Sequence, residues 1–151
     1  MRETLPDLTA MAAYGARIAA KLKAGDVVAL EGGLGAGKTT LTRAILASLG
    51  HAGEVPSPTF TIIETYSAPP LRLAVAHADF YRLEDPSELA EIGLDDYREG
   101  AVLLAEWPDH AGGFGHELGC LSITLLPLGE SGEGGRIAIA RAGADWVGRM
   151  P

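Results

Sequence analysis

The sequence lacks asparagine and glutamine entirely and has one cysteine among its 151 residues. The first absence excludes guanine-nucleotide switch proteins of the Ras kind, because their NKxD guanine-reading motif needs asparagine and their attacking water is oriented by glutamine. The single cysteine, Cys120, excludes an internal disulfide. Because it precedes an apolar run, we predict a core residue rather than a nucleophile, and we expect a protein of the reducing cytosol.

Long apolar runs and positive charge are also scarce. No stretch reaches the ~18 apolar residues of a membrane span, and residues 1–30 lack the order of a secretion signal, so we expect a soluble, unprocessed, cytoplasmic protein. Twenty acidic residues against three lysines and nine arginines give a net charge of −8. The surface should therefore repel RNA and anionic membranes, and any work on nucleic acid should need a basic partner.

Length and apolar patterning predict one domain over residues 1–151, because 47% hydrophobic residues suffice for a two- or three-layer core. A helix is predicted over 9–23, a buried strand over 26–30, and a second helix that ends at Gly50. Further strands are expected over 59–66, 71–79, 101–105, 121–128 and 136–142, with short helices over 86–92 and 94–99. These elements predict a three-layer α/β domain with a mixed, partly antiparallel sheet.

The stretch EGGLGAGKTT, residues 31–40, has P-loop spacing and lies between a predicted strand and a predicted helix. In such a loop, glycines let backbone N–H groups turn toward phosphates, and the helix N-terminus adds positive potential. Lys38 would reach the β and γ phosphates, and Thr39 would ligate Mg²⁺. The domain is therefore expected to be P-loop NTPase-like; the alternative is a glycine-rich turn that binds nothing.

Two acidic residues end predicted strands, where P-loop proteins build their sites. Asp79 ends an alternating strand, and Glu106 follows the apolar run 101–105. We predict both as catalytic residues, with Thr39 and Glu106 at the metal, although either acid can hold the metal while the other positions water. The alternative for each is a surface cap. His77 shares a strand face with Asp79, and we predict that it orients Asp79 rather than acting as a base.

Two further stretches have roles that the sequence leaves open. Trp107 follows Glu106 directly, and it is either a packing wedge or a stacking and docking surface. The proline-stiffened stretch SPTFT, residues 57–61, either senses the γ-phosphate as switch loops do or is an ordinary strand entry.

In this order and spacing, LEGGLGAGKTTLTR, SPTFT, HADFYR and LLAEWPD resemble the TsaE (YjeE) family of bacterial ATPases, over about residues 5–141. Members of that family take part in making threonylcarbamoyladenosine in tRNA. The resemblance implies an ATPase that uses ATP and Mg²⁺ and works with two other proteins, TsaD and TsaB. Its hydrolysis would support turnover of the complex rather than carbamoyl transfer, and it would reach tRNA only through that complex.

The resemblance also implies roles for single residues. Together with the loop spacing, it assigns nucleotide binding to Gly32, Gly35, Ala36, Gly37, Lys38, Thr39 and Thr40, and an adenine contact to Thr9. The family's acids fall on Asp79 and Glu106, and its tryptophan on Trp107. The chain departs from the family at Gly33, usually acidic or polar there, which bears on the hydrolysis rate. It also departs at Ala78 with Phe80, a swap of bulk that indicates altered core packing.

Two other functions use the same loop. A P-loop small-molecule kinase needs an acceptor pocket and usually an arginine-bearing lid, and no lid-like insertion stands between the predicted elements. A nucleotide-dependent binding module with little turnover would carry the same motifs. Only a hydrolysis rate, measured with and without partner proteins, separates that module from an ATPase.

Overall fold

The computed structural model describes residues 1–56, 62–129 and 134–151. The elements of these residues are, in chain order, β1 (Arg2–Leu5), α1 (Leu8–Lys21), β2 (Val27–Glu31), α2 (Lys38–Leu49), β3 (Ile63–Tyr66), β4 (Val75–Asp79), α3 (Glu88–Ile92), α4 (Leu94–Arg98), β5 (Val102–Glu106), η1 (Pro108–Ala111), β6 (Cys120–Pro127), β7 (Arg136–Ala142) and η2 (Ala144–Trp146), where η marks a 3₁₀ helix.

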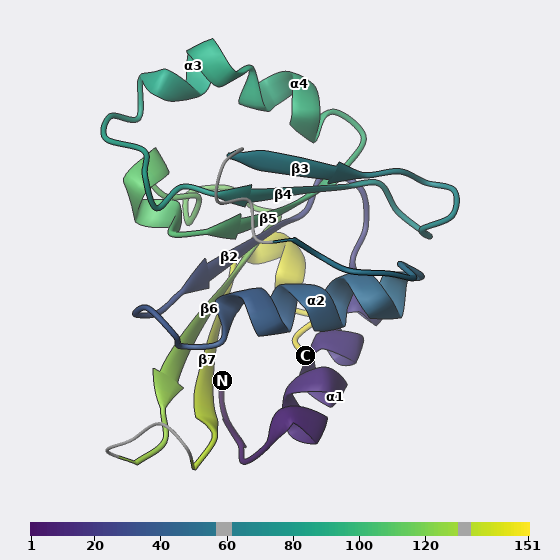
Figure 1. The fold of residues 1–151 in the computed structure, drawn as a ribbon, viewed down its shortest axis with the longest axis vertical. Helices are drawn as coiled ribbons and strands as arrows, with labels where there is room; N and C mark the ends of the chain where they lie inside the picture. The colour runs from purple at the N-terminus through teal and green to yellow at the C-terminus, as the bar shows by residue number, and fades with distance from the viewer. Residues whose placement is uncertain (57–61, 130–133) are drawn as a thin grey trace.

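The strands of the described residues form one seven-stranded sheet in the order β1-β7-β6-β2-β5-β4-β3 (Figure 1). Its centre is parallel, because β2 pairs with β5 and β6, and β4 pairs with β5. Both edges are antiparallel, through β6 with β7, β7 with β1, and β4 with β3. The expected mixed sheet is confirmed, and the parallel strands bring their carboxyl ends to one edge.

Helices cover both faces of the sheet. Side chains that alternate along the central strands pack into a core on each face. Val28 and Leu30 of β2 pack into a core with α1 and α2, whereas Val27 and Ala29 face a second core under α3, α4 and η1. Because β2 is covered on both sides, its first four residues, VVAL, are all buried and apolar without alternation. The three-layer α/β fold is thus confirmed.

The end of the chain closes the core beneath the sheet. Trp146 in η2 is fully buried, and its Nε1 donates to the Gly119 carbonyl at 2.9 Å. The Arg149 guanidinium lies over the Trp146 ring, 4.2 Å from its centroid, and donates to both carboxylate oxygens of buried Asp26, at 2.7 and 3.0 Å. This segment therefore joins the starts of β2 and β6.

Several predicted boundaries differ from the structure. The strand expected over 71–79 begins at Val75, although Leu71 is buried against the helices. Of the strand expected over 59–66, the structure shows Ile63–Tyr66, and the predicted phosphate sensor 57–61 lies outside the described residues. Strand β1 was not predicted, because RETL is short and polar and pairs only with the distant β7.

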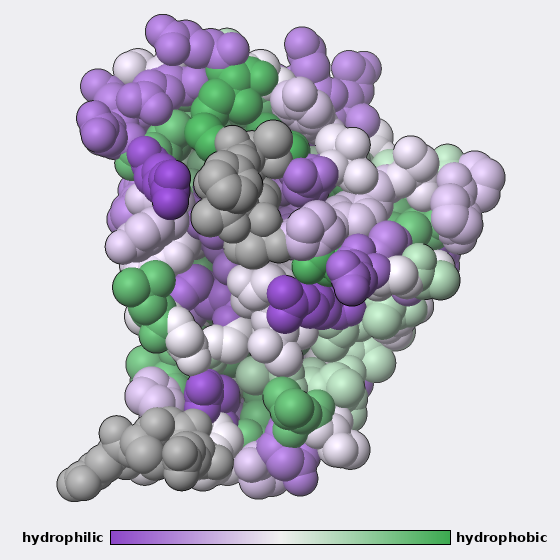
Figure 2. Space-filling model, viewed as in Figure 1, coloured by the Kyte–Doolittle hydropathy of each residue, from purple (hydrophilic) through white to green (hydrophobic). Residues whose placement is uncertain are grey.

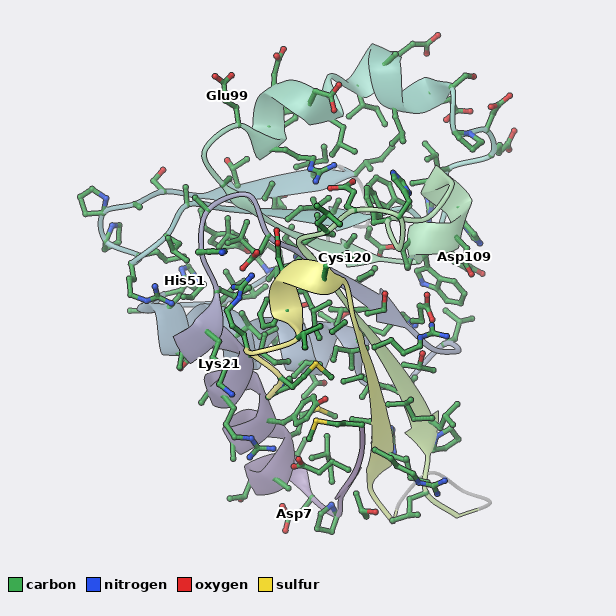
Figure 3. The ribbon with its side chains drawn as sticks, turned by 180° about the vertical axis from the view of Figure 1, so that it is seen from behind. Asp7, Lys21, His51, Glu99, Asp109 and Cys120 are labelled. Atoms are coloured by element: carbon green, nitrogen blue, oxygen red, sulfur yellow. The ribbon has the colours of Figure 1, made fainter. Side chains whose placement is uncertain are left out.

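Acidic residues gather on the surface around α3 and α4, which form the upper, largely hydrophilic part of the face in Figure 2. The exposed acids of this stretch are Glu84, Asp85, Glu91, Asp95, Asp96 and Glu99. Seen from behind, Glu99 and Asp7 mark opposite ends of the molecule, with Cys120 between them (Figure 3). Cys120 is buried, as predicted, and this burial raises the pKa of its thiol. None of the helices in the described ranges has the length and apolar character needed to cross a bilayer.

Candidate functional site

The glycine-rich loop 32–37 joins the carboxyl end of β2 to the first turn of α2. Gly32 has φ 147°, and a Cβ there would lie 2.7 Å from the Leu125 carbonyl oxygen, so no other residue fits without movement of β6. Gly37 is the N-cap of α2 in a left-handed conformation, with φ 105°. The loop therefore bends tightly and exposes the amino end of a 12-residue helix.

Lys38 lies buried in the first turn of α2 and folds back under the loop. Its Nζ donates to the carbonyls of Gly32 and Gly33, at 2.7 and 2.8 Å, and lies 4.2 Å from the centroid of the Trp107 ring. Burial lowers the pKa of Lys38, and the carboxylates of Glu106 and Asp79 oppose that shift. Gly33 is exposed and takes part through its backbone carbonyl, which any residue would supply.

Glu106 is almost fully buried at the end of β5, 2% exposed. Thr39 donates its hydroxyl to Oε1 at 2.9 Å, and the His77 ring contacts Oε2 through Nε2 at 2.6 Å. The predicted partner of His77 is therefore wrong: the ring bonds Glu106, not Asp79. The cause is the register of the parallel strands β4 and β5, in which His77 lies opposite Leu104 and Asp79 opposite Glu106. Because side chains alternate along a strand, His77 and Glu106 lie on the same face of the sheet, the face toward α2.

Asp79 lies directly opposite Glu106 in the register of β4 and β5 but has different surroundings. It is half-buried, and its Oδ1 accepts a hydrogen bond from the Tyr81 backbone N–H at 3.0 Å. Burial raises its pKa, reinforced by the charge of Glu106 and opposed by the Tyr81 hydrogen bond, His77 and Lys38. The two predicted acids thus meet beside the loop, one fixed and one open to solvent.

Trp107 is the one non-glycine residue of the described ranges with positive φ, 55°. Its half-buried ring contacts Lys38 and two other rings. Its centroid lies 5.0 Å from that of the exposed Tyr81 and 5.4 Å from that of the half-buried His110. His110 Nδ1 in turn contacts the backbone carbonyls of Phe80 and Tyr81, at 3.0 and 2.9 Å. The tryptophan is therefore a cover over the lysine, partly packed and partly accessible.

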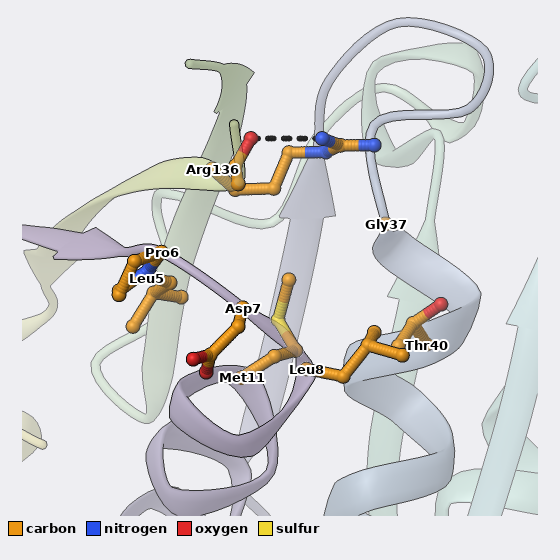
Figure 4. A pocket seen from close by; sticks show the side chains of 9 residues that line it. Leu5, Pro6, Asp7, Leu8, Met11, Gly37, Thr40 and Arg136 are labelled. Atoms are coloured by element: carbon orange, nitrogen blue, oxygen red, sulfur yellow. Dashed lines mark hydrogen bonds between the residues drawn. The ribbon is translucent and has the colours of Figure 1, made fainter. Parts of the chain in front are cut away.

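Two adjoining pockets flank the loop. One, of about 320 Å³, is lined by Leu34, Gly35, Ala36, Gly37, Lys38, Thr39, Thr40, Asp79, Glu106, Trp107 and Arg136. The other, of about 240 Å³, is lined mainly by apolar residues of the β1–α1 connection, Leu5, Pro6, Leu8 and Met11, and shares Gly37, Thr40 and Arg136 with the first (Figure 4). The first pocket has the more polar lining, and the second combines apolar side chains with Asp7, so together they suit a ligand with a charged end and a less polar end.

The predicted nucleotide residues are brought together with one exception. Gly35 to Thr40 line the polar pocket, and Gly32 accepts from Lys38. Thr9 is exposed in the first turn of α1 and is not among the residues that line the apolar pocket, so its adenine contact stays a prediction. Ala78 and Phe80 are both fully buried in the core under α3 and α4, and their altered packing relative to the family stays a prediction.

Sequence reasoning missed Arg136, the first residue of β7. Its Nε donates to the Ala36 carbonyl at 2.8 Å, and a terminal nitrogen donates to the Gly35 carbonyl at 2.9 Å. Figure 4 shows this guanidinium against the glycine loop. The only local signal was a lone arginine that opens a strand after a glycine-rich stretch, and nothing in that pattern says which loop it reaches.

The donor set beside the loop fits Mg²⁺. Thr39, Asp79 and Glu106 all offer oxygen atoms, and Mg²⁺ prefers oxygen ligands. No group of three or more His, Cys, Asp or Glu residues able to hold a metal occurs in the described ranges. Mg²⁺ sites in P-loop proteins typically use one or two carboxylates, while waters and phosphates complete the coordination.

A buried parallel strand, a glycine-rich loop with a lysine, and a helix that begins beneath it form the arrangement of P-loop nucleotide-binding proteins. Comparison with known proteins narrows that class. The model of the family described as threonylcarbamoyl adenosine biosynthesis protein TsaE matches residues 5–131. The chain therefore belongs to the TsaE family.

Individual relatives agree with this assignment. The TsaE protein of Haemophilus influenzae is 39% identical over 119 residues, which are 75% of this chain and 74% of that protein. The TsaE protein of Bacillus subtilis is 52% identical over 90 residues, 59% of this chain and 54% of that protein. Among solved structures, Bacillus subtilis YdiB matches with a TM-score of 0.76 and 30% identity, over 97% of this chain and 88% of YdiB.

Proposed function

We propose that this protein binds Mg·ATP and hydrolyses it to support TsaD and TsaB in forming threonylcarbamoyladenosine on tRNA. The observation that carries the proposal is the polar pocket, in which Lys38, the Thr39 hydroxyl and two acids converge beside the glycine loop. A loop alone is compatible with phosphate binding. The addition of two acids at one wall supplies what hydrolysis needs beyond binding.

The triphosphate would lie in the polar pocket. Backbone N–H groups of the loop and the amino end of α2 favour its negative charge, and Lys38 can exchange its two carbonyl partners for phosphate oxygens. Charge-assisted hydrogen bonds of this kind are the stronger ones. The adjoining apolar pocket at Leu5, Leu8 and Met11 suits the purine ring, and Arg136 lies where the two pockets meet.

Thr39 and Glu106 would hold Mg²⁺, because they already share a hydrogen bond on the pocket wall. When bound, the ion neutralises charge on the phosphate oxygens. Asp79 is the more accessible acid, and it would orient the attacking water and accept its proton. Water oxygen forms a bond to the γ-phosphorus while the bond from that phosphorus to the β–γ bridging oxygen breaks, which yields ADP and inorganic phosphate.

The charge of the chain supports a role for partner proteins in reaching tRNA. A net charge of −8 and the exposed acids around α3 and α4 disfavour direct contact with tRNA. Contact with tRNA would instead come through the complex with TsaD and TsaB, the partners implied by the family resemblance.

Phosphate release from ATP, measured for this protein alone and with TsaD and TsaB, tests the proposal. We expect slow release alone and faster release in the complex, together with modified tRNA. Tight binding with no release in either mixture would identify a binding module instead. Transfer of the γ-phosphate to an added small molecule, in place of its release, would identify a kinase.

A further inference from the structure

We propose that His77 is a positioning residue for Glu106: it holds that carboxylate in the orientation that keeps Oε1 at the Thr39 hydroxyl. This inference rests on the proposed function, because it assigns a role in the Mg²⁺-dependent step of the same site. It concerns a residue that touches neither of the two pockets, since His77 lines neither of them.

The contact itself defines the direction of the hydrogen bond. His77 Nε2 lies 2.6 Å from Glu106 Oε2, and an ionised carboxylate oxygen can only accept. The ring therefore donates from Nε2 and carries its proton there. Both side chains are removed from water, at 0% and 3% exposure, so the bond has no competition from solvent.

The two oxygens of Glu106 have separate partners. Oε1 accepts from Thr39 on α2, and Oε2 accepts from His77 on β4. Rotation of the carboxylate would break both bonds at once. Glu106 is thus held between the helix that begins at the glycine loop and the strand that ends at Asp79, and loss of the His77 bond would leave only Thr39 to orient it.

A purely structural role explains His77 poorly. Val75 of the same strand and Leu104 opposite it share its face of the sheet and are buried and apolar, and a buried imidazole costs free energy unless its polar atoms are bonded. His77 Nδ1 has no hydrogen-bond partner in the described part of the chain. The bond to Glu106 is therefore what offsets the burial of this ring, and an apolar residue of similar size would fill the same space at less cost.

Three substitutions separate the hydrogen bond from the packing. In His77→Gln the amide nitrogen reaches the place of Nε2, whereas in His77→Asn it matches Nδ1 and falls short of Glu106; His77→Leu removes both donors. Partners that orient a metal ligand are typically worth about 10- to 100-fold in activity or metal affinity. Asn and Leu should therefore lower Mg²⁺-dependent ATP hydrolysis by roughly 10- to 100-fold, while Gln stays close to the native rate.

The affinity for ATP should divide in the same way. Titration calorimetry in EDTA should give one ATP affinity for the native protein and all three variants, because the loop and Lys38 are unchanged. The increase in ATP affinity that Mg²⁺ causes should be smaller in His77→Asn and His77→Leu and should persist in His77→Gln. Melting curves identify any variant that fails to fold. Native Mg²⁺ dependence in folded His77→Asn, or a loss in His77→Gln as large as in His77→Leu, would overturn the positioning role.

A measurement without nucleotide tests the bond itself. The chain has four histidines, so ¹⁵N spectra of their imidazole rings are simple to assign with the His77 variants. We expect the His77 ring to carry its proton on Nε2. A proton on Nδ1 alone, with Nε2 unprotonated, would refute the inference, because the ring could not then donate to Glu106. If the native protein instead shows the Nε2 proton but neither binds nor hydrolyses ATP, the proposed function fails while the hydrogen bond stands.

Discussion

The ends of β4 and β5 lie side by side in the sheet, with Asp79 opposite Glu106, yet they hold their acids in opposite ways. Glu106 is 2% exposed and bonded through both oxygens to side chains from two other elements. Asp79 is half-buried, and the hydrogen bond to its carboxylate comes from the backbone two residues further on. The carboxylate at the end of β5 is therefore fixed and shielded from water, and the carboxylate at the end of β4 is accessible to solvent.

This difference bears on the proposed division of roles between the two acids. A carboxylate fixed at both oxygens is suited to hold an ion in one position, because its geometry does not change. A carboxylate open on one side can meet a water molecule that arrives from solvent. Parallel pairing places both carboxylates at the same depth, so the difference between them comes from their neighbours.

Replacement of Lys38 by alanine should have the largest effect, because this residue lies near both acids and is the lysine that lines the pocket. We expect productive Mg·ATP binding to be lost, as measured by calorimetry. Lys23→Ala, an exposed lysine outside the pocket, is the matched control and should bind normally. Unchanged affinity in the Lys38 variant would remove the basis for a phosphate site.

Glu106→Gln and Asp79→Asn compare the two strand ends directly. Each should lower ATP hydrolysis by about 10²-fold, the lower range for loss of an acid–base group, while nucleotide still binds. The Mg²⁺ concentration for half-maximal rate should rise in Glu106→Gln and stay near native in Asp79→Asn. Measurement of the rate against Mg²⁺ checks both statements, and equal Mg²⁺ dependence in the two variants would contradict the division of roles.

Trp107→Ala tests the cover over the rigid strand end. Because the ring is half-buried, its loss should destabilise the fold by less than the ~3–5 kcal/mol typical of a fully buried aromatic residue. Trp146→Ala, at 0% exposure, is the matched control and should reach that range. Chemical denaturation gives both values. A near-normal fold with an impaired TsaD and TsaB system would make Trp107 a docking surface; a loss equal to that of Trp146 would make it a packing wedge.

The smallest effect concerns the stability of the open strand end. Since burial raises the pKa of Asp79 in the folded state, folding disfavours its ionised form. The stability that this group contributes is present below its unfolded pKa and is lost as pH rises through the folded one. Asp79→Asn should therefore melt slightly higher than the native protein at neutral pH, and the gap should close at acidic pH. A gap that widens on acidification would give the shift the opposite sign.

The parts of the site that the sequence predicts are those encoded locally. The turn at Gly32 and the helix from Lys38 depend on residues within a few positions of one another, and Asp79 and Glu106 are recognisable because each ends a predicted strand. Periodicity and spacing read such features well. The fold class followed for the same reason, from alternating strands and helices.

The parts that the sequence did not predict depend on pairing between distant segments. His77 was assigned to Asp79 because both lie on one strand face, but the register of β4 with β5 gives it to Glu106. Arg136 reaches the loop only because β7 folds back along β6, and β1 exists only as a partner of β7. Register and strand order are set by the whole core, which no short window contains.

The contacts of the site also say when it can form during folding. Thr39 and Glu106 are 67 positions apart, and Arg136 and Ala36 are 100 apart, so the pocket is complete only after the last strand has joined the sheet. Contacts of such long range are slow to form. A nucleotide that needs the complete pocket would bind only the folded chain and not the unfolded one. By mass action it would therefore raise the melting temperature of the entire domain, from β1 at one edge of the sheet to β3 at the other.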